Sequence, residues 1–349
     1  MVILLGVVLG GAACKQRRAG PGAAGAPEVL ELRYMALPGM VYAHELAEDL
    51  GYLAPLRLVH VGDSFGGPQS IQSVATGDTD FGGAFNGAVI NLAARHAPLV
   101  AVLSLYGTDE NVQSGLYVRQ DGPIRGAADL VGKRIAMNTV GAHAEFITRE
   151  YLRRAGITGS ASQLALVALP PINVEQALRG GQVDAAIIGQ IYRDPAIERG
   201  GLRELFTDHG LYGPFAAGTY VMAKRFVQEH PITTQTFVAG TARAIEWSQR
   251  TPRAEVLARF RAIMNKRQRN ENDSLIKYWK GYGLARPGGV IADADFQIWI
   301  DWLVQSGDLK PGQIVAQDLY TNRFNPYAGA AAPGARAEGP TPAAPRAAQ

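Results

Sequence analysis

Short apolar runs alternate with amphipathic segments along most of the chain. The runs 29–35, 56–61 and 80–85 have the length and apolar content of strands, and segments with helical periodicity, such as 43–53, lie between them. The same alternation continues to about residue 189. It predicts an α/β fold with mostly parallel sheets.

From about Thr234 the pattern becomes mainly helical. Apolar residues recur there at the three- and four-residue spacing that places them on one face of a helix. We expect these helices to pack against the first α/β unit. The predicted helical segments are 237–250, 252–264, 274–283 and 293–307.

One motif occurs twice. The spacing Gln-x4-Gly-x2-Asp is found at 72–80 and again at 176–184. In each copy an amphipathic helix ends at a glycine, which can adopt the left-handed conformation of a C-cap, and the aspartate leads into an apolar strand. The repeat indicates two α/β lobes built alike, with chance similarity of a common helix–turn–strand unit as the alternative.

Composition agrees with a folded protein of one large domain or two moderate ones. The chain has 349 residues, 47% of them hydrophobic and 19% charged, which excludes general disorder. The net charge is +3, spread along the chain without a basic block. Neither a nucleic-acid groove nor a polybasic membrane patch is therefore expected.

The single cysteine, Cys14, is more informative. It excludes an intramolecular disulfide and a zinc site built from two or more cysteines. Residues 2–13 are all apolar or small, a run shorter than the ~20 residues that span a bilayer. Small residues before a cysteine resemble the bacterial lipobox, although Gly11 stands where leucine is usual. We expect a lipoprotein signal peptide at 1–14, lipidated at Cys14; the alternative is an idle cysteine near a signal cleaved elsewhere.

The remaining ends have little apolar periodicity. Residues 15–27 are charged or rich in glycine, alanine and proline, which predicts a flexible linker. Residues 327–349 are rich in alanine and proline, which predicts a disordered tail. The folded body is therefore expected within 28–326.

The order of elements in the body resembles a known family. Residues 128–133 read ADLVGK and residues 177–186 read ALRGGQVDAA, and both are similar to elements of the substrate-binding proteins of bacterial ABC importers. The similarity is to the nitrate/sulfonate/taurine and thiamine-pyrimidine-precursor binding family and spans roughly residues 28–260.

The resemblance implies a bilobal periplasmic-binding-protein fold of type II, with two α/β lobes joined by two hinge strands and the ligand between them. It places the crossings near Gly115–Arg119 and Ala216–Lys224. Lobe one would comprise 28–114 and 221–326, and lobe two 115–220.

Candidate ligand contacts are the loops that follow the strands. In open α/β sheets ligands bind at the carboxyl ends of strands, where helix N-termini offer free N–H groups. We expect a ligand-binding set of Met40, Tyr42, Ser64, Phe65, Phe85, Asn86, Tyr106, Thr139, Gly141, Ala142, His143, Gln190 and Tyr192.

The aromatic members of this set suit a flat or partly apolar ligand, with ordinary core packing as the alternative for each. Sulfonate-binding relatives typically carry a serine where this chain has Val140, so that only Thr139 offers a hydroxyl. This speaks against a sulfonate without excluding an anion.

Catalytic and metal-site patterns are weak. Residues 62–66 match the GxSxG nucleophile elbow around Ser64, but glycines there also suit a ligand loop, which we favour. His143 near a helix start is more typical of a hydrogen-bonding residue than of a base. No histidine motif for metal and no phosphate loop occurs, so we expect neither metal nor cofactor.

The sequence thus predicts a non-enzymatic, extracytoplasmic solute-binding lipoprotein of an ABC importer. It would bind a sulfonate-, nitrate- or pyrimidine-like ligand and deliver it to a permease and its ATPase. We expect a monomer in the periplasm or at the cell surface, anchored to a membrane and not bound to nucleic acid. The alternatives are an enzyme on the same fold, similar to the menaquinone-pathway proteins, and a ligand-sensing lipoprotein.

Overall fold

The computed structural model describes residues 25–159, 164–269 and 271–329. The expected signal peptide with Cys14, most of the expected linker and most of the expected tail lie outside these residues. In the described part of the chain, no helix is both long enough and apolar enough for a membrane span.

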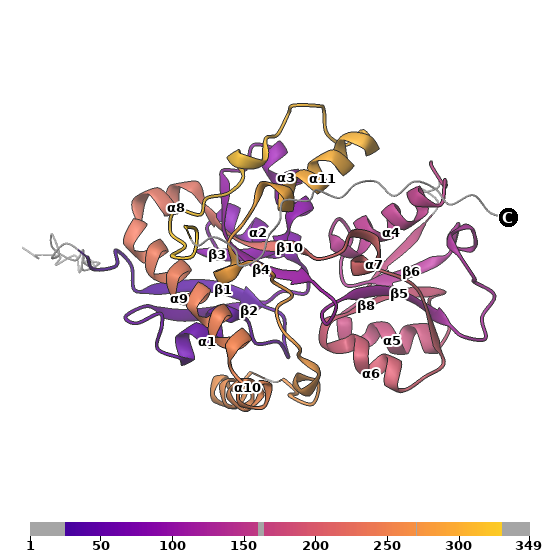
Figure 1. Cartoon of the computed structure of the whole chain (residues 1–349), viewed down its shortest axis with the longest axis horizontal. Helices are drawn as coiled ribbons and strands as arrows, with labels where there is room; N and C mark the ends of the chain where they lie inside the picture. The colour runs from indigo at the N-terminus through magenta and orange to yellow at the C-terminus, as the bar shows by residue number, and fades with distance from the viewer. Residues whose placement is uncertain (1–24, 160–163, 270, 330–349) are drawn as a thin grey trace, which may run out of the picture.

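The strands form two separate bodies, which we call lobe one and lobe two (Figure 1). Lobe one has a two-stranded sheet of β1 (Glu31–Ala36) and β2 (Arg57–Asp63). Its three-stranded sheet has the order β3 (Phe81–Phe85), β10 (Phe215–Ala223), β4 (Leu99–Thr108).

Lobe two is built on one five-stranded sheet. Its strand order is β7 (Ala165–Ala168), β6 (Arg134–Met137), β8 (Ala185–Gly189), β5 (Ser114–Arg119), β9 (Leu202–Thr207).

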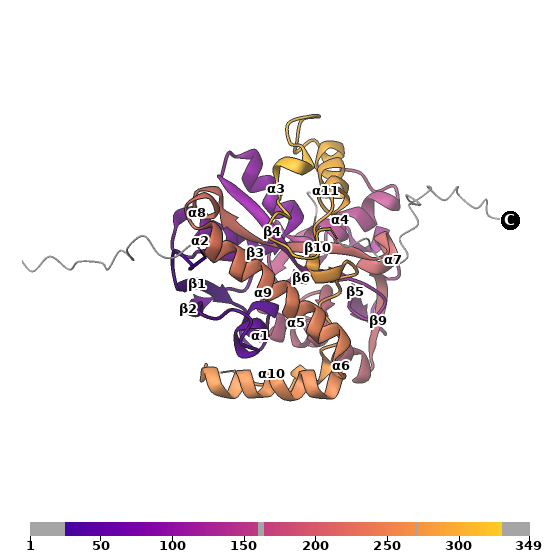
Figure 2. The same ribbon diagram turned by 60° about the vertical axis from the view of Figure 1, so that its left-hand side comes forward.

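Helices cover both bodies, and α9 and α10 extend along lobe one (Figure 2). The helix bounds are α1 (Ala43–Asp49), α2 (Gly67–Thr76), α3 (Asn86–Ala94), α4 (His143–Arg154), α5 (Pro171–Arg179), α6 (Arg193–Glu198), α7 (Asp208–Tyr212), α8 (Lys224–Glu229), α9 (Pro231–Arg250), α10 (Arg253–Arg267) and α11 (Asp293–Ser306).

The expectation of mostly parallel sheets is wrong. The pairs β1–β2, β6–β7 and β6–β8 are parallel, but β10 is antiparallel to β3 and β4, and β5 is antiparallel to β8 and β9. β5 and β10 are the strands that the chain enters after passing from the other lobe. A chain that enters a sheet from the opposite end must run against its neighbours, and hydrophobic patterning does not reveal that direction.

The two crossings also differ from expectation. They were expected at Gly115–Arg119 and Ala216–Lys224, and the structure places them just before, at 109–113 and 208–214. The expected segments lie almost entirely in β5 and β10, whose apolar side chains are buried within a sheet of one lobe. By strand membership, lobe two ends before β10 rather than at residue 220.

The two links run side by side. Thr108 pairs with Phe215 at the end of the lobe-one sheet, and Gly115 pairs with Thr207 in the lobe-two sheet. Two short antiparallel links between rigid sheets have the geometry of a hinge.

The repeated motif has the same local structure in both lobes. In lobe one, the Arg33 side chain donates to Asp80 and to the carbonyl oxygen of Gly77, at 2.8 and 2.9 Å. In lobe two, Arg134 bonds Asp184 and the carbonyl oxygen of the matching glycine. Gly77 and Gly181 both have positive φ, as the repeated motif predicts for a glycine at a helix end.

The helix expected at 274–283 is mostly absent. Only Ile276–Tyr278 form a short 3-10 turn, η4, and the chain then continues without regular structure. Gly283 has a φ of 66°, and a Cβ there would lie 2.4 Å from the carbonyl oxygen of Gly107. The close approach of two backbones requires glycine and prevents a continuous helix.

Trp299 of α11 packs where the lobes meet. Its side chain is fully buried, and its ring contacts Phe85 of lobe one and Phe146 of lobe two at centroid distances of 4.7 and 5.9 Å. The ring centroids of Tyr212, in the second link, and Phe215, the first residue of β10, lie 5.1 and 5.8 Å away. One aromatic cluster therefore joins both lobes and the hinge.

Replacing Trp299 should destabilise the whole protein. We expect Trp299→Ala to lower the free energy of unfolding by about 3–5 kcal/mol, because it leaves a large cavity among well-packed rings. Gln297→Ala, an exposed position on the same helix, should change it by no more than about 0.5 kcal/mol. Denaturant unfolding checks both, and equal losses would contradict the packing argument.

Candidate ligand-binding cleft

A cleft with a volume of about 240 Å³ lies between the lobes. Lobe one contributes the loops after β1 and β2 and strand β3, and lobe two contributes the start of α4 and the residues after β8. Residues 111–114, at the first link, and residues 278–282 form further parts of the wall. A ligand in this cleft would touch both lobes and the hinge at once.

Most of the residues predicted to contact a ligand line this cleft. These residues are Met40, Tyr42, Ser64, Phe65, Phe85, Tyr106, Ala142, His143, Gln190 and Tyr192. Eight of them follow the carboxyl ends of strands, as the sequence argument required, whereas Phe85 is the last residue of β3 and Tyr106 lies within β4.

Asn86 does not line the cleft. Its side chain is fully buried, and Nδ2 donates to the carbonyl oxygens of Ala216 and Asp295 at 3.1 and 3.0 Å. The amide therefore ties α3 to β10 and α11, which is a packing role that a position after a strand does not reveal.

Thr139 and Gly141 also lie outside the cleft lining. Thr139 packs against Gly66 of lobe one, so closely that a Cβ on Gly66 would lie 2.8 Å from Thr139 Cβ. Gly141 has a φ of 78°, and its N–H donates to Glu145 Oε2 at 2.7 Å. The expected donor at this helix start is thus already used within lobe two.

Sequence reasoning missed His44, Tyr220, the residues 111–114 and the segment 278–282, all of which line the cleft. His44 and Tyr220 lie within regular elements rather than in loops. The apolar pattern at 274–283 predicts a helix, although Gly281 and Gly283 favour an irregular segment, which is what the structure has.

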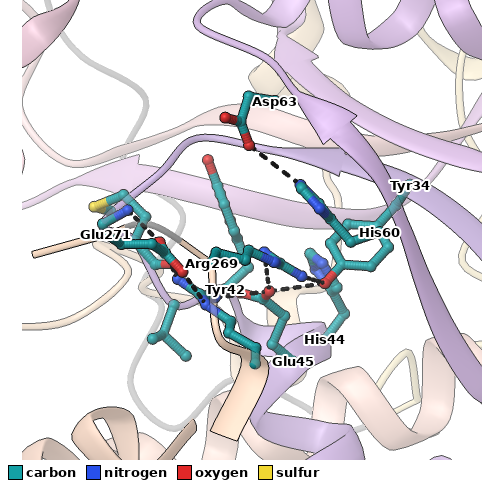
Figure 3. Close-up of polar contacts among 12 residues, drawn as sticks. Tyr34, Tyr42, His44, Glu45, His60, Asp63, Arg269 and Glu271 are labelled. Carbon is teal, nitrogen blue, oxygen red and sulfur yellow. Dashed lines mark hydrogen bonds and ion pairs between the residues drawn. The ribbon is translucent and has the colours of Figure 1, made fainter. Parts of the chain in front are cut away.

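A buried carboxylate organises the lobe-one wall (Figure 3). Glu45 Oε1 accepts hydrogen bonds from Tyr34 Oη at 2.8 Å and from Arg267 and Arg269 at 2.8 and 3.1 Å. Burial alone would raise the pKa of Glu45, but Arg267 and the neighbouring groups outweigh it and hold the pKa below its ordinary value. Glu45 is therefore charged, and Oε2 accepts from the backbone N–H of Tyr42 at 3.1 Å.

The same network fixes the loop after β1. Arg267 donates to the carbonyl oxygen of Met40 at 2.8 Å and to Glu271 at 2.5 and 2.6 Å. Glu271 in turn accepts from the N–H of Gly39 at 2.5 Å. Charge-assisted bonds from residues far along the sequence thus hold the loop that carries Met40 and Tyr42.

His44 lies among aromatic rings beside this network (Figure 3). Its centroid is 4.8 Å from that of Tyr34 and 5.0 Å from that of Phe81, and Nδ1 lies 3.1 Å from Tyr220 Oη. Burial lowers the pKa of His44 to about 4. The imidazole is therefore neutral at pH 7.

Asp208 lies at the hinge with its side chain almost completely buried. It accepts hydrogen bonds from Thr108 Oγ1 at 2.8 Å, from the N–H of Ser114 at 3.0 Å and from the N–H of His209 at 2.8 Å. These donors belong to the end of β4, the start of β5 and the start of the second link. One carboxylate therefore bonds both crossings.

His143, the first residue of α4, lies next to this carboxylate. Its ring stacks on Phe85 of lobe one at 5.3 Å. Nε2 lies 3.4 Å from Asp208 Oδ2, which is ion-pair range, but makes no hydrogen bond to any described residue. Burial lowers the pKa of His143, and Asp208 opposes the shift only in part.

The charged side chains of the cleft form pairs. Lys280, which follows η4, makes an ion pair with Asp194 of α6 in lobe two. Arg193 donates to Tyr117 Oη at 2.8 Å and to Glu204 at 3.1 Å. The Lys280–Asp194 pair therefore also joins the lobes beside the cleft.

The lobes also meet where the loop after β2 contacts the loop after β6. Asn138 Nδ2 of lobe two donates to the carbonyl oxygen of Phe65 at 3.4 Å. Next to it, Gly66 packs on Thr139 with no room for a side chain. These contacts cover one side of the cleft.

The nucleophile interpretation of Ser64 finds no support in its contacts. Ser64 Oγ donates to the carbonyl oxygen of Gly66 at 2.9 Å and lies 3.5 Å from Gln69 Oε1, and neither partner is a base of the kind a nucleophile needs. Among the described residues, no group of three or more histidines, cysteines or acidic residues could hold a metal ion.

A family model described as "NMT1/THI5 like" matches residues 56–255. The match covers more than half of the chain, so the chain belongs to this family. The chain is also 28% identical over 242 residues to a "Putative aliphatic sulfonates-binding protein" of Escherichia coli K12, covering 67% of this chain and 72% of the relative.

Solved structures show the fold. The periplasmic aliphatic sulphonate binding protein SsuA from Escherichia coli has a TM-score of 0.63 at 20% identity, covering 91% of this chain and 98% of that one. The nitrate-binding protein NrtA from Synechocystis PCC 6803 has a TM-score of 0.64 at 11% identity, covering 86% and 88%. The expected periplasmic-binding-protein fold is therefore confirmed.

The contact between Gly66 and Thr139 makes a testable prediction about how far the lobes close. Gly66 has an extended backbone with a φ of −156°, which alanine also adopts, so Gly66→Ala should not strain the loop. Its methyl group would instead lie 2.8 Å from Thr139 Cβ and Oγ1. We expect the lobes to separate until an ordinary contact distance of 3.4–4 Å is reached.

Spin labels at the exposed positions Val61 and Ile197, one on each lobe, measure the separation by double electron–electron resonance. Gly66→Ala should lengthen the distance, and adding Thr139→Gly should restore it. The matched control is Gly126→Ala, which has an extended φ of −160° and nothing within 4 Å of a new methyl group. An unchanged distance in Gly66→Ala would refute the contact.

Proposed function

We propose that this member of the NMT1/THI5-like family is the solute-binding component of an ABC importer. It binds a small organic or anionic ligand between its lobes and delivers that ligand to a permease with its ATPase. The observation that carries the proposal is the cleft of about 240 Å³ lined by both lobes and by the first link. The names of the similar proteins, which bind sulfonates or nitrate, support the same function.

The geometry supplies a mechanism. A ligand that contacts both walls stabilises the closed arrangement more than the open one, and so shifts the population toward closure. The short links at 109–113 and 208–214 absorb the motion while the sheets move as rigid bodies. Closure then presents one joined surface to the permease.

The function we propose is binding without catalysis. Ser64 and His143 are the candidates for an enzyme on this fold, but the Ser64 hydroxyl is bonded to the backbone. His143 lies beside the hinge carboxylate, which suits closure better than proton transfer to a ligand. We likewise propose a monomer, since one chain forms both walls of the cleft.

We further propose that the protein is tethered to a membrane through a lipid on Cys14, in the periplasm or at the cell surface. The support is the apolar run 2–13 and the small residues before Cys14. A tether would keep the receptor near its permease.

Ligand binding should raise the melting temperature. A thermal-shift panel of sulfonates, nitrate, pyrimidines and flavins is expected to include a compound that stabilises the protein, by about 2.7 kcal/mol at one hundred times its dissociation constant. Tyr106→Ala, in the cleft, should remove most of the shift, and Tyr151→Ala, outside it, should not. A panel without any stabilising compound would count heavily against the receptor function.

The lipid tether has its own test. Cys14→Ser removes the thiol that would carry the lipid, so we expect the full-length protein to move from the membrane fraction to the soluble fraction of its host. Ser64→Ala, expressed alongside, should leave the distribution unchanged. Membrane attachment that persists in Cys14→Ser would contradict the tether.

A further inference from the structure

The cleft offers no unpaired cation to an anionic ligand. Among the described residues that line it, the cationic side chains at pH 7 are Arg193 and Lys280. Lys280 is paired with Asp194, and Arg193 bonds Glu204 and Tyr117. An anion that bound to either cation would compete with its present carboxylate partner.

The start of α4 is also unfavourable for an anion. The positive end of a helix normally attracts negative charge, but the carboxylate of Glu145 already occupies it and accepts from the N–H of Gly141. Arg149 holds that carboxylate in place through Nε at 2.6 Å. A sulfonate at the start of α4 would therefore compete with Glu145 for the N–H of Gly141.

Unpartnered nitrogen atoms point to a different kind of ligand. Trp279 and His44 line the cleft and are only 5% and 3% exposed. Neither Trp279 Nε1 nor His44 Nε2 has a hydrogen-bond partner among the described residues. Buried polar groups are rarely left unpaired in proteins, and an indole N–H can only donate. A ligand that satisfies Trp279 must carry an acceptor.

The rest of the wall is aromatic. Tyr42, Phe85, Tyr106 and Tyr192 line the cleft from both lobes, and such side chains pack well on flat rings. The neutral imidazoles of His44 and His143 add hydrogen-bonding capacity without charge.

We infer that the cleft selects an uncharged, ring-bearing ligand with at least one hydrogen-bond acceptor, held by Trp279 and His44, and that it discriminates against permanent anions such as sulfonates. The inference rests on the proposed receptor function and narrows its ligand class. The inferred ligand class differs from that of the similar proteins whose names include sulfonates.

Matched probes test the charge preference. Benzamide, benzoate and benzenesulfonate share one ring and differ in charge, and their naphthalene analogues extend the set. We expect the amides to bind about tenfold more tightly than either acid at pH 7, measured by ligand-observed NMR titration. Trp279→Phe keeps a ring but removes the donor and should weaken the amides about fivefold, while Trp247→Phe, outside the cleft, should not.

Asp194→Asn frees Lys280 and should increase benzenesulfonate binding several-fold, while Asp121→Asn at an exposed site outside the cleft leaves it unchanged. Tighter binding of the acids by the unsubstituted protein would overturn the inference and leave the receptor function intact. No binding by any probe would overturn the inference and weaken the receptor function as well. Amide binding unchanged in Trp279→Phe would overturn the role of Trp279.

Discussion

Both passages of the chain between the lobes are bonded to one buried carboxylate, that of Asp208. It accepts from the last strand before the first link, from the first strand after it and from the start of the second link. A buried charge with several donors is costly to disturb, so the links are held together where they meet. The relative position of the two links beside the cleft therefore depends on this carboxylate.

The two walls of the cleft are stiff for different reasons. In lobe one, Glu45, Arg267 and Glu271 hold the loop after β1 by charge-assisted bonds within a buried network (Figure 3). In lobe two, Glu145 accepts a hydrogen bond from the N–H of Gly141 and so fixes the loop that leads into α4. Rigid walls joined by short links favour motion at the hinge. Ligand binding then has a small entropic cost for ordering loops.

The Lys280–Asp194 pair shows how the interface between lobes also shapes the cleft. The pair joins the segment after η4 to α6 and at the same time neutralises two charged side chains that line the cleft. Electrostatic contacts that assist closure thus reduce the capacity of the cleft for anions. The aromatic lining and the unpartnered nitrogens remain as the recognition chemistry.

Much of this architecture could be predicted from the sequence. Alternating apolar runs predicted the α/β fold, and the repeated glycine and aspartate motif predicted matching local structures, which Arg33 and Arg134 realise with equivalent contacts. Loops after strands predicted most of the cleft, because the sheet geometry brings them together.

The failures have physical causes. Strand direction and the exact links depend on how the chain enters each lobe, which apolar patterning does not encode. Asn86 follows a strand but is used for packing, and His44 reaches the cleft from within a helix. The networks of Glu45 and Asp208 join residues far apart in the sequence, and a single sequence gives no signal for such pairs.

The central claim is that ligand binding closes the two lobes about the Asp208 hinge. Small-angle X-ray scattering, with and without a saturating concentration of the compound that most raises the melting temperature, measures this directly. The account predicts a smaller radius of gyration in the presence of the ligand. An unchanged radius with the ligand bound would contradict it.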